Sequence, residues 1–557
     1  MKNQIINSVL RNWKSGITVA LVNIPLSVAL AIASGATPAQ GIITAFWAGL
    51  FASLFGGSHY NIVGPTGALS GLLFGFAVLY GMSLLPLLAL LSGVCILLAF
   101  FFRLDRYIIF IPKSVIYGFT LGIAIILALG QAENALGISL ASKSKNVLEN
   151  IVMIFQHIPE TNIPVFLLFL FGVGFLVLWR EKVPKFPGAI VLCMIGILIS
   201  LVTQGTSFFG THLLTIGDQY PNLQIQMGNM FWWNELPRDI FLKKEFWTIT
   251  LAVALIAILE TLLSGQIADS MTHTKFNRPK EVFGLGIANI VSGLFGGIPA
   301  TAALARTALN IQSGASHRTS GILNCVFLMA IALLLFSFFR LIPLAIIASL
   351  LVFVAIFMVE KKQFVDLLEK EKFSFSLSLL VAFLTVADDP LVGILVGTVI
   401  ALLFFINNIA KGETEVLLWK DGKMVESVLK NDFLKKTTIE SDLVVYKISG
   451  MLTYLNMPAH LEAAQKIRGN QYVIVSLRHA FYVDAEGISY LREIIEALKE
   501  GNEKVFLSGI NPKVEKKIRK ENFYQKKLIE NKIFTRTSEA IQTIFRENKS
   551  PTTTPSS

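Results

Sequence analysis

The sequence has little charge for its length. Only 15% of its 557 residues are Asp, Glu, Lys or Arg, whereas soluble domains carry about 25%. Hydrophobic residues make up 54%. This composition excludes an ordinary soluble protein and predicts a polytopic membrane protein in a lipid bilayer. The formal net charge of +11 does not indicate nucleic-acid binding, because Lys and Arg fall in short segments between apolar runs and in the C-terminal part.

Cysteine is also scarce. The three cysteines, Cys95, Cys193 and Cys325, all lie inside apolar runs, so neither a disulfide nor a cysteine metal site is expected. No nucleophile–base pair, metal-ligand cluster or nucleotide-binding loop stands out, so the sequence does not predict an enzyme or an organic cofactor. A cleavable signal peptide is not expected either, because the polar segment Met1–Lys14 precedes a run of full span length, Gly16–Ser34.

The apolar runs form two sets of seven. Several are shorter than the roughly 20 residues that a full membrane span needs. The first set lies near 16–34, 40–56, 67–80, 84–102, 112–130, 163–179 and 187–203, and the second near 246–265, 281–296, 300–313, 319–339, 341–358, 373–387 and 390–410.

Basic residues predict the orientation. With fourteen spans, seventeen Lys and Arg residues that flank the spans fall on the side of the N-terminus and six on the other. Positive charge stays inside, so both termini are predicted to be cytoplasmic and the protein to lie in the inner (plasma) membrane. Seven spans per half make the two halves inverted repeats. The long segments 131–162 and 204–245 are then outside, the second with Trp232, Trp233 and Trp247 for an interface belt.

Two stretches interrupt the apolar runs at corresponding places in the two halves. Leu54–Leu69 reads LFGGSHYNIVGPTGAL and Leu294–Arg306 reads LFGGIPATAALAR. Each starts with LFGG, continues to a proline and then to small residues. Paired, Gly/Pro-interrupted segments are the best sequence pointer to a transporter's substrate site. The alternative is a pair of loops that share LFGG by chance.

We interpret the two breaks as the starts of half-helices that face an anion. The free N–H groups and positive dipole end of a helix N-terminus attract anions, and small side chains let the backbone approach the ligand. The residues expected to open the two half-helices are Thr66, Gly67 and Ala68 in the first half and Thr301, Ala302 and Ala303 in the second.

Two charged residues lie within apolar spans. Arg306 follows the second break, and intramembrane charges usually face a cavity or pair with one another. Glu260 lies in the middle of a span, with Ser264 four residues on along the same helical face. A carboxylate there can bind a cation such as Na⁺ or carry a proton, and the sequence does not choose. The structural alternative is an internal Glu260–Arg306 ion pair. Asn23, just before Pro25, is a further candidate to line the cavity, with support of a helix kink as its alternative.

After about Lys411 the sequence becomes that of a soluble α/β domain. Expected strands are Leu443–Ile448, Tyr472–Leu477 and Lys504–Leu507. Glu486–Lys499 has helical spacing of its apolar residues, and Pro512–Lys520 and Ser538–Phe545 are also predicted helices. This alternation predicts a small α/β layer structure. The tail from Glu547, rich in Pro and Thr, is expected to be disordered.

Four patterns together resemble the SulP anion-transporter family. They are GITVALVNIP (Gly16–Pro25), GPTGA (Gly64–Ala68), NIVSGLFGGIPATAALARTALN (Asn289–Asn310) and, in the tail, VDAEGISYLREI (Val483–Ile494), which is similar to the signature of a STAS domain.

The resemblance implies a core domain and a gate domain built from seven plus seven inverted spans, anion transport and a homodimer. It also implies that Arg306 lies by the anion and that Glu260 and Ser264 stand where family members bind a coupling cation. Antagonist-type STAS domains have a phosphorylatable serine in the turn, and Ala485 here excludes that reaction. The STAS domain is then expected to serve dimerisation and regulation, with an unidentified regulatory partner, or only assembly and stability.

The expected protein is therefore a secondary active transporter of a small inorganic oxyanion, sulfate or bicarbonate, in symport with H⁺ or Na⁺. Alternatives are a dicarboxylate or chloride transporter or exchanger, a nucleobase permease of the same fold, and a membrane sensor or scaffold with vestigial transport. The expected organisation is a cytoplasmic N-terminus (1–15), a membrane domain (16–410, with repeats at about 16–203 and 246–410), a STAS domain (411–546) and a disordered tail (547–557).

Overall fold

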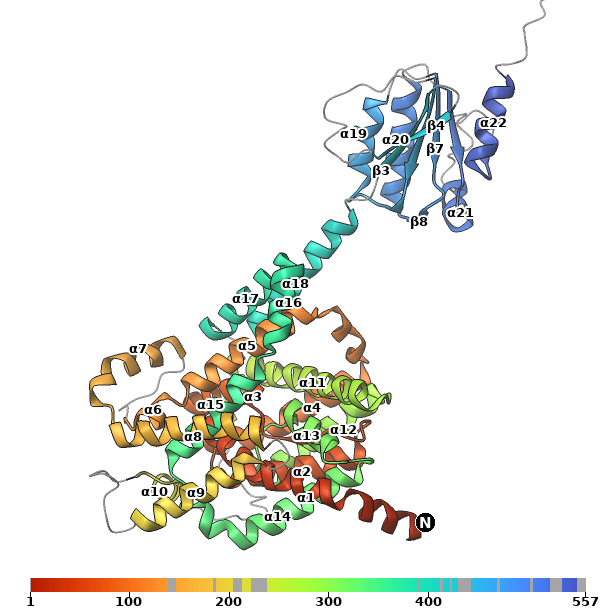
Figure 1. The fold of residues 1–557 in the computed structure, drawn as a ribbon. Coiled ribbons are helices and arrows are strands. Elements are labelled where there is room, and N and C mark those ends of the chain that lie inside the picture. The colour runs from red at the N-terminus through yellow and green to blue at the C-terminus, as the bar shows by residue number, and fades with distance from the viewer. Residues whose placement is uncertain are drawn as a thin grey trace, which may run out of the picture. The chain divides into compact units, whose positions relative to one another are not determined.

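The computed structural model divides the chain into two compact units, Met1–Ile400 and Ala401–Ser557 (Figure 1). The residues it describes are 2–138, 147–183, 187–203, 213–221, 238–388, 390–410, 414–420, 423–428, 442–467, 471–500, 504–520 and 533–547.

Each of the fourteen predicted apolar segments coincides with a helix. They are α1 (Lys2–Ala33), α2 (Pro38–Phe55), α3 (Gly67–Tyr80), α4 (Leu85–Phe101), α5 (Lys113–Leu129), α8 (Ile163–Lys182), α9 (Gly188–Thr203), α11 (Lys244–Thr272), α12 (Arg278–Leu294), α13 (Leu304–Gln312), α14 (Thr319–Phe339), α15 (Leu344–Met358), α17 (Lys372–Ala387) and α18 (Pro390–Ala410).

In the described part of the chain, seven helices are long and apolar enough to cross a membrane. Five further apolar helices are shorter. The polytopic membrane fold is therefore confirmed, while the number of fourteen crossings stays a prediction.

The two long segments predicted to lie outside contain short helices that the sequence did not predict. The first contains α6 (Ala132–Leu136), α7 (Val147–His157) and η3 (Ile158–Glu160), and the second contains α10 (Ile216–Gln219) and η5 (Arg238–Leu242). Further short helices in the described part of this unit are η1 (Met82–Leu84), η2 (Leu104–Phe110) and α16 (Lys361–Lys370). Trp232 and Trp233 lie outside the described residues. Trp247 is exposed, and its Nε1 donates to the carbonyl of Phe241 at 2.9 Å.

The helices of the two halves pack in exchanged pairs. α4 packs on α12 as α14 packs on α2, and α1 packs on α14 as α11 packs on α4. Likewise α5 packs on α17 as α15 packs on α8. This is the pattern expected of two inverted repeats, because a contact between two helices of different halves recurs between the equivalent helices with the halves exchanged. The helices α1–α4 and α11–α14 form one group, and α5, α8, α15 and α17 form a second.

Small residues set the distance between helices, as is typical in membranes. At the α4–α12 contact, a Cβ on Gly293 would lie 2.5 Å from the backbone nitrogen of Leu90, and one on Gly93 would lie 2.6 Å from that of Ile290. A Cβ on Gly118 of α5 would lie 2.2 Å from the carbonyl of Ser378 on α17. Any larger residue at these positions would push the helices apart.

The C-terminal unit is an α/β layer structure with a six-stranded sheet of order β10-β9-β7-β5-β3-β4. β5, β7, β9 and β10 are parallel, and β3 pairs antiparallel with β4 and β5. The strands are β3 (Thr414–Lys420), β4 (Lys423–Val428), β5 (Leu443–Ile448), β6 (Gly450–Leu452), β7 (Tyr472–Ser476), β8 (Ala480–Val483), β9 (Lys504–Ser508) and β10 (Ile533–Phe534), and the helices α19 (Met457–Lys466), α20 (Ala485–Lys499), α21 (Pro512–Lys520) and α22 (Thr537–Glu547).

Side chains of β5 alternate between two cores. Val444 and Tyr446 pack on the face covered by α19 and α20, whereas Val445 packs on the face covered by α22 (Figure 1). The predicted strands and helices of this unit are confirmed. The sequence did not predict β3, β4, β6, β8, β10 or α19. The expected disordered tail lies, apart from Glu547, outside the described residues.

Candidate functional site

The two breaks lie side by side and pair as a short antiparallel sheet. β1 (Val63–Gly64) pairs with β2 (Thr301–Ala302), with Val63 opposite Ala302 and Gly64 opposite Thr301. The first half-helix, α3, begins at Gly67 as predicted. The prediction for the second was partly wrong: Thr301 and Ala302 belong to the strand, and α13 begins at Leu304 after Ala303. Strand pairing between residues so distant in sequence was not expected.

Neither half-helix has a side-chain cap. Thr66 precedes α3 and Ala303 precedes α13, and neither of these N-cap residues makes a side-chain cap hydrogen bond. The same holds for the N-cap residues of α5, α11 and α15. By contrast, Thr37 caps α2 and Asn277 caps α12. An uncapped N-terminus keeps N–H groups and the positive end of its dipole available to a ligand. Gly67 and Ala68, predicted to bind the anion, lie at such an end.

Glu260 joins both breaks. Its Oε2 accepts a hydrogen bond from Thr66 Oγ at 2.9 Å and another from Thr301 Oγ at 2.8 Å. Glu260 itself comes from the middle of α11 and is partly exposed. The two threonines were predicted to contact the anion, but their hydroxyls are directed to this carboxylate. One carboxylate oxygen therefore forms hydrogen bonds to residues at the starts of both half-helices.

Arg306 is almost completely buried, with 1% of its surface exposed. One terminal nitrogen donates to Asn23 Oδ1 at 2.7 Å and the other donates to the carbonyl of Pro65, while Nε has no partner among the described residues. No salt bridge joins Arg306 to Glu260 in the described part of the chain. The alternative of a direct ion pair between them is thus wrong.

Asn23 is fully buried and belongs to a polar network. Besides Arg306, its Oδ1 accepts from Ser27 Oγ at 2.9 Å, and its Nδ2 donates to Asn324 Oδ1 at 3.5 Å. The structure therefore brings Asn23 and Arg306, two separately predicted site residues, into direct contact. It places Asn23 behind the guanidinium rather than at a cavity surface.

Other polar residues of α13 also hold the backbone of the first break. Thr307 Oγ accepts from the amide of Ile62 at 3.2 Å, and Asn310 Nδ2 donates to the carbonyl of Tyr60 at 2.9 Å. Ser264 Oγ donates to Thr307 Oγ at 2.9 Å, so this predicted cation ligand has a partner on α13. Together with Arg306, these side chains satisfy backbone groups that no helix or long sheet would satisfy.

Glu281 is a second buried carboxylate, and the sequence reading missed it. Its Oε2 accepts from the amides of Gly57 and Ser58, both at 2.7 Å, and its Oε1 accepts from Asn61 Nδ2 at 2.7 Å. The residue lies in the first turn of α12, beside cationic residues, where an acidic side chain is unremarkable in sequence. Its three donors hold the LFGG turn of the first half against α12.

Two histidines lie where the loops after α2 and α13 meet. The rings of His59 and His317 have centroids 5.0 Å apart. Partial burial lowers the pKa of His59, and the charge of Arg318 lowers it further. The pKa of His317 is lowered by burial and by the same arginine. Both shifts favour the neutral imidazole.

Comparison with known proteins agrees with this architecture. A model of the sulfate permease family matches residues 10–381, and a model of the STAS domain matches residues 435–540. A Bacillus subtilis (strain 168) protein named as a sulfate transporter, YvdB, is 33% identical over 513 residues, which are 92% of this chain and 93% of that one. The bicarbonate transporter BicA of Picosynechococcus sp. is 30% identical over 351 residues, 60% of this chain and 59% of that one.

Solved structures share the fold. The transmembrane domain of a cyanobacterial bicarbonate transporter BicA superposes with a TM-score of 0.62 at 26% identity, covering 70% of this chain and 97% of that one. The murine Slc26a9 anion transporter in the inward-facing state superposes with a TM-score of 0.81 at 15% identity, covering 97% of this chain and 92% of that one. At 15% identity this likeness shows the fold alone. The chain, with its paired breaks and C-terminal STAS domain, belongs to the sulfate permease family, which consists of anion transporters and not enzymes.

Proposed function

We propose that this protein is a secondary active transporter of a small inorganic oxyanion, sulfate or bicarbonate. The observation that carries the proposal is the pair of uncapped half-helices, α3 and α13, whose starts are joined by β1 and β2. Backbone amides at such ends replace part of an anion's hydration shell without a strongly bound counter-charge. The relatives named as sulfate and bicarbonate transporters support this substrate class.

Residues around the half-helices have distinct roles in this proposal. Gly67 and Ala68 present backbone amides to the anion. The amide of Ala303, which was predicted to do the same, donates instead to the carbonyl of Ile62 at 3.2 Å. Arg306 contributes its positive charge from behind the first break and fixes the Pro65 carbonyl. It acts as a positioning residue through its bonds to Asn23 and to the Pro65 carbonyl.

Glu260 is proposed to bind the coupling cation. A negative charge beside an anion site is unfavourable unless a cation accompanies the substrate, since each charge then offsets the desolvation of the other. The carboxylate and the hydroxyls of Thr66 and Thr301 are hard oxygen groups that suit Na⁺, and protonation of the carboxylate would serve equally. Ser264 donates to Thr307 and keeps its oxygen lone pairs, so this bond does not distinguish Na⁺ from a proton.

Transport would proceed by alternating access, with α1–α4 and α11–α14 as the moving core and the other group as the gate. Both termini and the STAS domain are proposed to lie in the cytoplasm, in the inner (plasma) membrane. We further propose a homodimer in which the STAS domain serves assembly and regulation, with a partner still to be identified.

Three other functions are distinguishable from this one. A chloride or dicarboxylate transporter or exchanger would use the same amides with a different substrate. A nucleobase permease is disfavoured because the family has been established and the chain carries a STAS domain. A membrane sensor or scaffold with vestigial transport would bind anions without moving them.

Counterflow into proteoliposomes tests the proposal. Vesicles loaded with sulfate, bicarbonate, chloride or fumarate are given the labelled anion outside, with and without a Na⁺ or pH gradient. We expect uptake of sulfate or bicarbonate that an inward cation gradient drives above equilibrium. Protein-free liposomes are the control. Exchange of chloride or fumarate without any cation dependence would favour an exchanger, and no flux of any anion would favour the sensor.

A further inference from the structure

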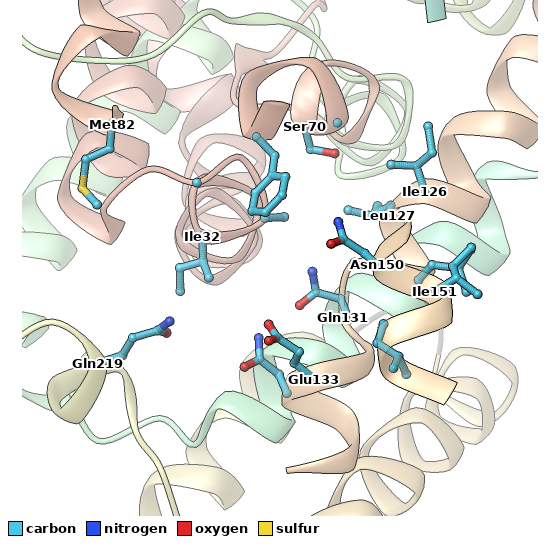
Figure 2. A pocket seen from close by; sticks show the side chains of 18 of the residues that line it. Ile32, Ser70, Met82, Ile126, Leu127, Gln131, Glu133, Asn150, Ile151 and Gln219 are labelled. Atoms are coloured by element: carbon cyan, nitrogen blue, oxygen red, sulfur yellow. The ribbon is translucent and has the colours of Figure 1, made fainter. Parts of the chain in front are cut away.

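Large apolar side chains are exposed in both units of the chain, but for different reasons. Many of those in the first unit belong to helices long and apolar enough to cross a membrane, where lipid covers them. Others line a cavity of about 220 Å³ between α1, α3, α5, α6, α7 and α10, as Met82 does (Figure 2). In the described part of the STAS domain no helix is long and apolar enough to cross a membrane, so exposed apolar side chains there indicate a contact surface.

Four residues account for the exposed large apolar side chains of this domain. Tyr454 and Leu455 are 56% and 43% exposed, and Phe481 and Tyr482 are 61% and 47% exposed. No other large apolar side chain that the structure describes after residue 413 is exposed to this extent. Tyr454 and Leu455 follow shortly after β6, and Met451 of β6 lies opposite Tyr482 of β8, so strand pairing brings the two parts to one end of the domain. We call these four residues the apolar patch.

The two aromatic residues of β8 are exposed together. Ala480 and Val483 at the ends of this strand are buried, whereas Phe481 and Tyr482 between them are exposed. Successive side chains of a regular strand point to opposite faces, so one of the two rings would normally face the core. In the pairing with β6, however, Phe481 is an extra residue without a partner, and such a bulge re-aims the side chains beside it. Neither ring belongs to the core of the domain.

The apolar patch lies at the end of the domain that is connected to the last membrane helix. α18 ends at Ala410 and β3 begins at Thr414, so this connection spans at most about 15 Å. Thr414 lies opposite Ile448, the last residue of β5, and β6 begins two residues after Ile448. α18 is long and apolar enough to cross a membrane. The surface of the bilayer is therefore close to the end of the domain that carries the patch.

The chemistry of the patch suits the interface between lipid and water. Aromatic rings and Leu beside a basic side chain are typical of protein surfaces that lie in this interface. Lys517 of α21 is exposed, with its Nζ 4.9 Å from the ring centroid of Tyr482, and it donates to the carbonyl of Val483 at 2.6 Å. Such a cation attracts lipid phosphates. A stable protein partner would need about 20–30 residues on each side, many more than the four of the patch.

We propose that the apolar patch inserts into the interfacial layer of the lipid bilayer, on the side of the membrane where α18 ends. The rings of Phe481 and Tyr482 lie at the level of the headgroups, Leu455 reaches the first carbons of the acyl chains, and Lys517 contacts lipid phosphates. This contact orients the STAS domain on the membrane in addition to its covalent connection. The inference requires that α18 crosses the membrane, but it does not depend on which anion is transported.

Fluorescence quenching in lipid nanodiscs tests the contact with the full-length protein. Leu455→Cys is labelled with bimane, an apolar dye that replaces the leucine, and a nitroxide near the top of the lipid acyl chains serves as the quencher in the membrane. Iodide serves as the quencher in water. Asp442→Cys is the matched control, because Asp442 is exposed and lies before β5, at the opposite end of the sheet. Wild type treated with bimane gives the background from the three native cysteines.

We expect the lipid nitroxide to quench the label at position 455 and not the label at position 442, with the reverse order for iodide. The label at position 455 should also emit at a shorter wavelength. Iodide quenching at both positions without lipid quenching would mean that the patch lies in water. Shielding of position 455 from both quenchers would mean that a protein surface, such as a second copy of the chain, covers it. Equal lipid quenching at both positions would mean that the contact is not specific to the patch. Each of these three results would overturn the proposal.

A charge placed in the patch tests which residues make the contact. Phe481→Glu should abolish lipid quenching of the label at position 455 and expose it to iodide, because a carboxylate is unfavourable in the interfacial layer. Gln471→Glu adds the same charge to an exposed residue at the opposite end of the sheet and should leave the quenching unchanged. Both positions are exposed, so both variants should unfold at the wild-type temperature. Undiminished lipid quenching in folded Phe481→Glu protein would contradict the assignment.

Discussion

The two breaks begin with the same four residues, LFGG, yet contribute differently to the site. The first break supplies mainly backbone: the Tyr60 carbonyl, the Ile62 amide and the Pro65 carbonyl all bond to α13. The second supplies the side chains that satisfy them, from Arg306, Thr307 and Asn310. In the corresponding first turns of α3, the one polar side chain is Ser70, which donates to the carbonyl of Gly67 in its own helix.

This difference shows that the two halves of an inverted repeat can keep a similar backbone while only one of them supplies the polar side chains. β1 and β2 are equivalent, and the threonines Thr66 and Thr301 bond equivalently to Glu260. The polar face of α13 has no counterpart on α3. We infer that α13 holds the shape of the first half-helix start, while α3 keeps its amides free for the ligand.

Among the variants that test this difference, Arg306→Ala should cause the largest loss of stability and of anion uptake. It leaves the Pro65 carbonyl and Asn23 without their donor and creates a cavity, which should cost about 3 kcal/mol of unfolding free energy. Anion uptake should fall at least about tenfold, because the first half-helix start loses both its support and a nearby positive charge. Thermal unfolding in detergent and uptake into proteoliposomes measure the two effects.

Arg318→Ala is the matched control for Arg306→Ala. Arg318 bonds to the carbonyl of Leu54 and is partly exposed, so its loss should change stability little. If Arg306→Ala unfolds at the wild-type temperature and keeps the wild-type half-saturation for every anion, α13 does not hold the first break.

The fold could be predicted from the sequence further than the site could. Length and apolarity identify both ends of α3 and α14 and the end of α1, because the bilayer imposes a simple pattern, whereas the polar first turns of α1, from Lys2, were missed. The bonds from Thr66 and Thr301 to Glu260 join residues 194 and 41 positions apart, and no local pattern encodes them. The start of α13 was misplaced because Thr301 and Ala302 satisfy their backbone by pairing with the first break.

Other features of the site carried no sequence signal either. Glu281 resembles an ordinary acidic residue at a helix start, and only the fold brings the LFGG turn to its carboxylate. The partners of Arg306 could not be predicted either, because sequence spacing gives the helical face of a side chain but not the residues that the fold places opposite that face.

Thr66→Val and Thr301→Val should have equal, intermediate effects. Each removes one hydroxyl from the Glu260 carboxylate, worth about 1.5 kcal/mol, and should raise the half-saturation constant for Na⁺ about tenfold. If the coupling cation is a proton, the effect has the opposite sign, because the hydroxyls stabilise the ionised carboxylate and their loss strengthens proton binding. The double variant should show less than the sum, because both groups bond to one oxygen. Uptake is measured at a series of Na⁺ concentrations and external pH values. A change in one variant alone would mean that the carboxylate serves only one break.

Thr307→Val and Ser70→Ala should show the smallest effects, and they should differ. Thr307 accepts from the Ile62 amide and from Ser264, so its loss should cost about 1 kcal/mol. Ser70→Ala removes only a bond within its own helix, and the cost should be about 0.3 kcal/mol or less. Unfolding temperatures of the two variants measured side by side check this. Equal losses would contradict the asymmetry between the breaks.

Concentrative uptake by Glu260→Gln tests the central claim most directly, that one carboxylate couples cation binding to both half-helices. Gln keeps the size and one oxygen but cannot ionise. Wild type and variant are compared in vesicles under an imposed Na⁺ or proton gradient, with Glu281→Gln as the control for losing a buried carboxylate. We predict that Glu260→Gln still exchanges anion but no longer accumulates it, while folded Glu281→Gln protein still does. Accumulation by Glu260→Gln to the wild-type level would show that Glu260 is structural and contradict the coupling mechanism.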